Sequence, residues 1–214
     1  MSQGGTETIH EVDFCAQIAA SATNIFHAHP DSFPFKEARI EGFGSGSLAR
    51  KRKDLRFYNA FGALLLTSET KLPGPGKERD PYNETVVRVA QQKADDADVR
   101  YFFTWNVNTF VLWDRKLWNV PLLDRRVQEW NLDRYLSNAQ AVAVPATLHY
   151  LKTKFLPSLL SDLANICTEK VHDWGMALNP KRWKKIKRLR ELHLRARPDP
   201  IENLDLFMEA RQTA

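Results

Sequence analysis

Three side chains in the first half of the sequence could together hydrolyse a phosphodiester bond. Asp54 opens one apolar segment, and the next apolar segment ends in Glu69, Thr70 and Lys71. Carboxylates suit Mg²⁺, which polarises a phosphate and lowers the pKa of a bound water. A lysine beside that water could position it and stabilise the charge of the transition state. Asp54, Glu69 and Lys71 are therefore candidates for a metal-dependent catalytic site.

A β-hairpin is the element that would bring these side chains together. Residues 54–58 and 63–71 have the apolar character of strands, and residues 59–62 suit a tight turn. Antiparallel pairing would return the end of the second strand to the start of the first. Because side chains alternate along a strand, Glu69 and Lys71 should face the same side. Solvated charges at the ends of an ordinary hairpin would show the same spacing, so spacing alone leaves both interpretations open.

The flanking segments predict an α/β fold. Apolar residues recur at helical spacing over residues 8–28 and again over residues 81–97, where Asp80-Pro81 suits a helix start. Strands are expected at residues 37–42 and as a pair over 99–115. Beyond these, the segments 125–136, 145–174 and 179–194 have helical patterns. We therefore expect a mixed β-sheet flanked by helices over residues 1–118, and a helical extension over residues 119–214.

This order of elements resembles the PD-(D/E)xK nuclease superfamily. It is most similar to the N-terminal nuclease domain of type I-like restriction enzymes and adenine-methyltransferase fusions. The resemblance covers about residues 7–115 and rests on KDLRFYNAFGALLLTSETKLP and on VRYFFTWNVNTFVLWD. It implies a restriction-endonuclease-like fold in which Asp54 and Glu69 bind the metal and Lys71 positions or activates water. Lys53 stands where the family name expects proline, a residue that takes no part in the chemistry.

The same resemblance implies two further site residues. A glutamate of the first helix would complete the metal site, and Glu11 matches it best, with Glu7 as second choice. Glu11 could instead form a capping box with Thr8 at the start of that helix. A glutamine on the helix after Glu-x-Lys would also contribute, and Gln91 is the candidate, with Gln92 beside it.

Positive charge is concentrated in two segments. The chain has a net charge of +5, yet residues 181–197 alone carry nine Lys/Arg and one Glu. A basic helix of this kind could bind the DNA backbone, pack against its own domain, or lie on a membrane surface. Under the nuclease interpretation we expect contacts to DNA phosphates from two groups of residues: Arg50, Lys51 and Arg52, and Lys184, Lys185 and Arg188.

The remaining features limit the class of protein. No apolar run is long enough to cross a bilayer, the N-terminal residues lack a secretory pattern, and Cys15 and Cys167 match no metal spacing. We expect a cytoplasmic, Mg²⁺-dependent endodeoxyribonuclease of a restriction-modification or anti-phage defence system, with Mn²⁺ able to substitute. DNA is the expected partner, with no membrane, and methyltransferase or helicase domains are candidate partners in a larger complex. The alternative is a catalytically silent nuclease-fold module that binds nucleic acid or scaffolds such a complex.

Overall fold

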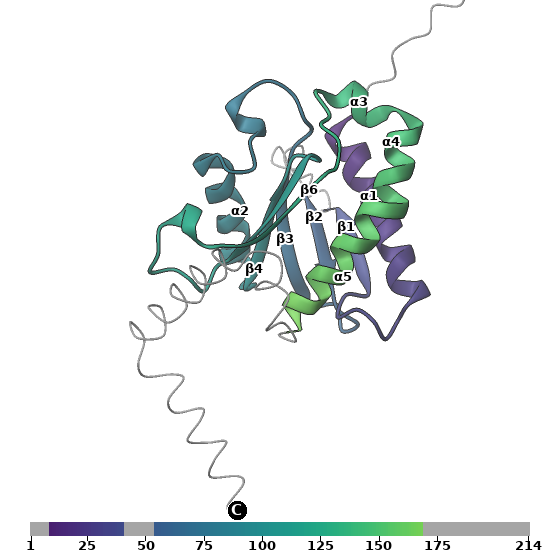
Figure 1. Ribbon diagram of the computed structural model, residues 1–214. Coiled ribbons are helices and arrows are strands. Elements are labelled where there is room, and N and C mark those ends of the chain that lie inside the picture. The colour runs from purple at the N-terminus through teal and green to yellow at the C-terminus, as the bar shows by residue number, and fades with distance from the viewer. Residues whose placement is uncertain (1–8, 41–53, 169–214) are drawn as a thin grey trace, which may run out of the picture.

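A six-stranded mixed β-sheet forms the centre of the computed structural model, which describes residues 9–40 and 54–168 (Figure 1). The strands lie in chain order across the sheet. They are β1 (Glu37–Ile40), β2 (Leu55–Tyr58), β3 (Leu64–Thr70), β4 (Tyr101–Trp105), β5 (Thr109–Asp114) and β6 (Arg126–Asn131). Strands β3 and β4 are parallel, and every other neighbouring pair is antiparallel. The predicted mixed sheet flanked by helices is confirmed.

Helices cover both faces of this sheet. Helix α2 (Glu84–Asp96) lies on one face, while α1 (Glu11–Ala28) and the run of helices after β6 lie on the other (Figure 1). That run consists of α3 (Ala139–Ala143), α4 (Pro145–Tyr150), the π-helical turn η4 (Leu151–Phe155) and α5 (Leu156–Cys167). The short 3-10 turns η2 (Lys77–Arg79) and η3 (Leu122–Asp124) lie in loops.

Two helices begin later than their sequence patterns predict. Helix α2 is capped by Asn83, whose side chain accepts from the Thr85 backbone N–H at 3.0 Å, rather than by Asp80. Helix α1 begins at Glu11 with His10 in the N-cap position. Glu11 is therefore the first helical residue and not the third, so the capping box at Glu11 is wrong. Thr8, the other half of that box, lies outside the described residues.

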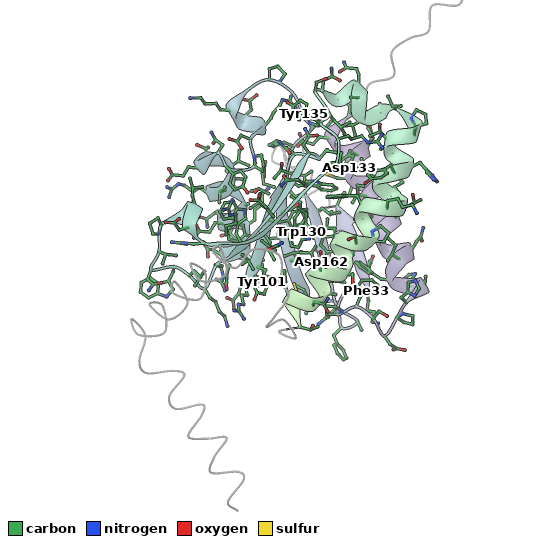
Figure 2. The ribbon with its side chains drawn as sticks, viewed as in Figure 1. Phe33, Tyr101, Trp130, Asp133, Tyr135 and Asp162 are labelled. Atoms are coloured by element: carbon green, nitrogen blue, oxygen red, sulfur yellow. The ribbon has the colours of Figure 1, made fainter. Side chains whose placement is uncertain are left out.

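The helical interpretation of residues 125–136 is also wrong, because residues 126–131 form strand β6. This strand pairs with β5 from Thr109–Asn131 to Trp113–Arg126. Trp130 explains the outcome: its ring packs against Phe110 at 5.5 Å, and its indole N–H donates to Asp162 of α5 at 2.7 Å (Figure 2). The open edge of β5 offers hydrogen bonds that helical periodicity cannot reveal. The expected division at residue 118 therefore falls within one continuous sheet.

The larger hydrophobic core joins the first helix to the last one described. It contains Phe14 and Ile18 of α1, Trp105 of β4, and Leu159 and Leu163 of α5. The rings of Phe14 and Trp105 lie 5.2 Å apart. A smaller cluster on the opposite face packs α2 against β4 and β5. Two packed layers thus hold the sheet between helices, which keeps the strand ends in place.

A side chain takes the place of backbone pairing at the open end of the hairpin of β2 and β3. At its tip, the predicted turn forms, with the Asn59 side chain accepting from the backbone N–H groups of Phe61 and Ala63 at 2.9 Å. At its open end, the Ser68 hydroxyl accepts from the Leu55 backbone N–H at 3.0 Å and donates to the Leu55 carbonyl at 2.9 Å. Ser68 is fully buried, so this one side chain satisfies both backbone groups of Leu55.

We expect Ser68→Ala to lower the free energy of unfolding by about 1–3 kcal/mol, because it leaves two buried backbone groups without their partner. Thr67→Val is the matched control, since the buried Thr67 hydroxyl has no hydrogen-bond partner among the described residues. It should change stability by less than about 0.5 kcal/mol or raise it. Urea unfolding of both variants measures the difference. Equal losses from the two variants would contradict a special role for Ser68.

Candidate active site

Asp54 and Glu69 lie opposite each other at the open end of the hairpin. Strand pairing sets Phe57 beside Leu66, and the Ser68 side chain then bonds the backbone of Leu55, the residue after Asp54. Both carboxylates contact the ammonium of Lys93 on α2: Asp54 through Oδ2, and Glu69 through Oε2 at 2.5 Å. Only 5% of the Asp54 side chain and 10% of the Glu69 side chain are exposed. The two predicted carboxylates are thus adjacent and largely removed from solvent.

Lys71 occupies the other side of Glu69. Its Nζ lies 2.5 Å from Glu69 Oε1 and 3.5 Å from Glu11 Oε1. Lys71 directly follows the last residue of β3, and its backbone N–H donates to the Trp105 carbonyl at 2.7 Å. This position at the strand end lets the side chain reach Glu11, which comes from the helix on the opposite face from α2. The structure therefore brings Asp54, Glu69, Lys71 and Glu11 into one cluster.

The residue that α2 contributes is Lys93, not the predicted Gln91. Gln91 is half-buried and makes no side-chain hydrogen bond to the cluster within the part of the chain that is described. Gln92 instead donates to the exposed Asp96 at 2.9 Å. A signal for Lys93 was present: it follows Val86 and Ala90 at helical spacing, on the stripe that faces the sheet. A charged residue on an otherwise apolar stripe indicates a buried partner.

Burial and nearby charges shift the pKa values of the two facing carboxyls in opposite directions. Burial raises the pKa of Asp54 to about 6, with Glu69 adding to the rise and Lys93 opposing it. Burial also acts to raise the pKa of Glu69, but Lys93 and Lys71 together hold it below its usual range. Burial acts to lower the pKa of Lys71, yet Glu69 and Glu11 leave it raised. Glu69 therefore stays ionised in acid that protonates Asp54.

Cys15 lies close to this cluster but has no reactive character. Burial raises the pKa of its thiol to about 12, and the nearby charges of Asp54 and Glu11 add to that rise. A thiol becomes a nucleophile or metal ligand only as the thiolate. Cys15 is therefore a packing residue beside the site.

The donor set suits a hard divalent cation. Mg²⁺ takes oxygen ligands and is commonly held by one or two carboxylates with waters completing its shell. Asp54 and Glu69 supply two such carboxylates around one point, and the Ser68 carbonyl oxygen lies 3.5 Å from the nitrogen now at that point. Glu11 contacts Lys71, which in turn contacts Glu69, and within the described residues Glu11 makes no hydrogen bond to either Asp54 or Glu69. Over residues 9–40 and 54–168, no cluster of three or more His, Cys, Asp or Glu side chains forms a ready metal site.

The predicted DNA contacts cannot be placed on this structure. Arg50, Lys51 and Arg52, and likewise Lys184, Lys185 and Arg188, fall outside the described ranges. Their assignment to DNA binding stays a prediction. In the described portion, no helix has the length and apolar character needed to cross a membrane.

Comparisons with known proteins support the fold. No protein-family model matches the chain, and no curated protein matches it. One similar solved structure is a crystal structure of the type IIG restriction endonuclease BpuSI, at a TM-score of 0.50 and 12% identity. The match covers 79% of this chain but 19% of that one, so this chain spans about a fifth of its length. At this identity the likeness concerns the backbone alone, and it shows that the chain has a restriction-endonuclease-like α/β fold.

Proposed function

We propose that this chain is a metal-dependent endodeoxyribonuclease domain. The observation that carries the proposal is a pair of buried carboxylates. Asp54 and Glu69 both contact the ammonium of Lys93, and Lys71 contacts the other carboxylate oxygen of Glu69. The structural likeness to a restriction endonuclease supports DNA as the substrate. We further propose a role in restriction-modification or anti-phage defence, with methyltransferase or helicase domains as partners, since the similar structure is far longer than this chain.

Each side chain has a defined task in this proposal. Asp54 and Glu69 would hold Mg²⁺ or Mn²⁺, which supplies Lewis-acid polarisation of the phosphate and a bound water of lowered pKa. Lys71 would position the attacking water and offset the negative charge that builds on the phosphate. Glu11 steadies Lys71 from the opposite side at 3.5 Å. The hairpin carries Asp54, Glu69 and Lys71 at one strand end, so these three groups would need little reorganisation during the reaction.

A second candidate function is a nuclease-fold module that binds nucleic acid without cleaving it. Lys93 favours this candidate, because its ammonium already contacts both carboxylates at the point where a metal would bind. Three carboxylates and two ammoniums in the cluster leave one net negative charge when all are ionised. A metal that displaced Lys93 would meet two net negative charges from the three carboxylates and Lys71, which is why we place the nuclease first.

Removing the charge of either carboxylate should abolish cleavage. We expect Asp54→Asn and Glu69→Gln to reduce Mg²⁺- or Mn²⁺-dependent nicking of supercoiled plasmid by about a hundredfold or more, and Lys71→Met to act similarly. Asp96→Asn on α2 is the matched control, because Asp96 is exposed and bonds only Gln92 among the described residues. It should cleave like the unaltered protein. Metal-dependent nicking that survives all three changes, or its absence from the unaltered protein, would contradict the nuclease proposal.

Metal binding should strengthen as the pH rises through about 6, the value to which burial raises the pKa of Asp54. A carboxyl must lose its proton before it binds a metal, and at pH 5 the folded protein holds Asp54 mostly protonated. The affinity for Mn²⁺ should therefore increase about tenfold between pH 5 and pH 7 and then level off. Titration calorimetry without DNA measures this, with Asp96→Asn expected to follow the same curve. An affinity that does not change over this range would contradict the assignment of Asp54 as a ligand.

A further inference from the structure

Three oxygen atoms lie around the ammonium of Lys93. Its Nζ contacts Asp54 Oδ2, lies 2.5 Å from Glu69 Oε2, and is 3.5 Å from the carbonyl oxygen of Ser68. Only 19% of its side chain is exposed. The surroundings of this nitrogen are thus those of a bound cation: two charged oxygens and one neutral oxygen, with little water.

The position of Lys93 is set by a rigid part of the fold. Helix α2 is anchored by Val87, Ala90 and Ala94, which are buried in the smaller hydrophobic cluster against β4 and β5. Lys93 therefore reaches the carboxylates from a fixed backbone through a flexible side chain. A change of rotamer would move the ammonium away from the carboxylates without moving the helix.

Lys93 and Lys71 differ in which oxygen of Glu69 they contact. Lys71 lies at Oε1, on the side of Glu11, and Lys93 lies at Oε2, on the side of Asp54. A metal shared by Asp54 and Glu69 needs the space that Lys93 Nζ fills, but it does not need the space of Lys71. Two like charges at one point are strongly unfavourable where water is scarce. The metal and the Lys93 ammonium therefore exclude each other.

We propose that Lys93 is a resident counter-ion that stabilises the metal-free site and must be displaced before a divalent metal binds. This inference rests on the metal site of the proposed function, but it concerns how that site is filled rather than what it does to DNA. Without Lys93, two buried carboxylates would face each other with Lys71 as the remaining ammonium of the described cluster. Lys93 thus stabilises the metal-free protein and weakens the binding of a metal.

Lys93→Met tests this trade-off on the full chain, with Mn²⁺ alone as the probe and no DNA present. We expect calorimetry to show Mn²⁺ binding at least about tenfold tighter than in the unaltered protein, because the competing cation is gone. The Tm of the metal-free variant should fall by roughly 5 °C, because buried charges lose their partner, and Mn²⁺ should restore it. Lys152→Met is the matched control: Lys152 donates to Gln17 at 2.6 Å, on another face of the molecule. Its Mn²⁺ affinity should equal that of the unaltered protein.

A second measurement uses the unaltered protein and does not depend on the variant folding. Acetylation followed by peptide mass spectrometry reports how accessible each lysine is. Saturating Mn²⁺ should raise the acetylation of Lys93 severalfold and leave that of Lys152 unchanged. Unchanged or reduced acetylation of Lys93 would overturn the proposal.

The outcomes separate this inference from the proposed function. Tighter Mn²⁺ binding by Lys93→Met supports the counter-ion role even if no form of the protein cleaves DNA, a result that would refute only the nuclease proposal. Equal or weaker Mn²⁺ binding by Lys93→Met overturns the counter-ion role even if the unaltered protein cleaves. Absence of Mn²⁺ binding from both proteins overturns it as well.

Discussion

Two carboxylates that face each other at a buried hairpin end repel, and compensation of that repulsion is the constraint on which the rest of the site depends. Asp54 and Glu69 are nearly excluded from water, so bulk solvent screens them little. Two ammoniums compensate this repulsion from different directions, Lys93 from α2 and Lys71 from the end of β3. Burial raises the pKa of Asp54 despite the opposing charge of Lys93, whereas Lys93 and Lys71 hold the pKa of Glu69 below its usual range.

The sheet topology makes this compensation possible. The parallel pair β3 and β4 requires a crossover, and that crossover contains α2, which is why Lys93 can lie above Glu69. Ser68 holds the start of β2 against β3 where direct backbone pairing has ended, and so it keeps Asp54 at the height of Glu69. Helix α1 closes the opposite face and delivers Glu11 to Lys71. Four separate elements therefore meet at one end of the sheet.

The restriction-endonuclease-like fold and the chemistry of the site support the proposed nuclease function in different ways. Folds host many functions, so the backbone likeness by itself carries no activity. The cluster adds what the likeness lacks: hard oxygen ligands around one cation and a lysine beside them. Lys93 lies at the centre of that cluster, at the point where the proposed metal would bind.

Local sequence was sufficient for the hairpin. Alternation and the turn at residues 59–62 place Asp54, Glu69 and Lys71 at one strand end, because strand geometry and pairing are local properties. The α/β class follows from the same periodicities. Strand β6 could not be predicted, since Trp130 and its neighbours form a strand only because β5 offers an open edge and Asp162 offers a partner.

The sequence by itself predicted that Asp54, Glu69 and Lys71 share one strand end, where their side chains form the cluster proposed for nuclease chemistry. Tertiary structure alone decided that Lys93, 24 residues from Glu69 and 39 from Asp54, lies between them, and that Gln91 does not. The physical reason is that contacts within a hairpin follow from the period of the strand. The residue that a crossover helix presents to a strand depends instead on where that helix packs, and buried contacts across the whole sheet set that position.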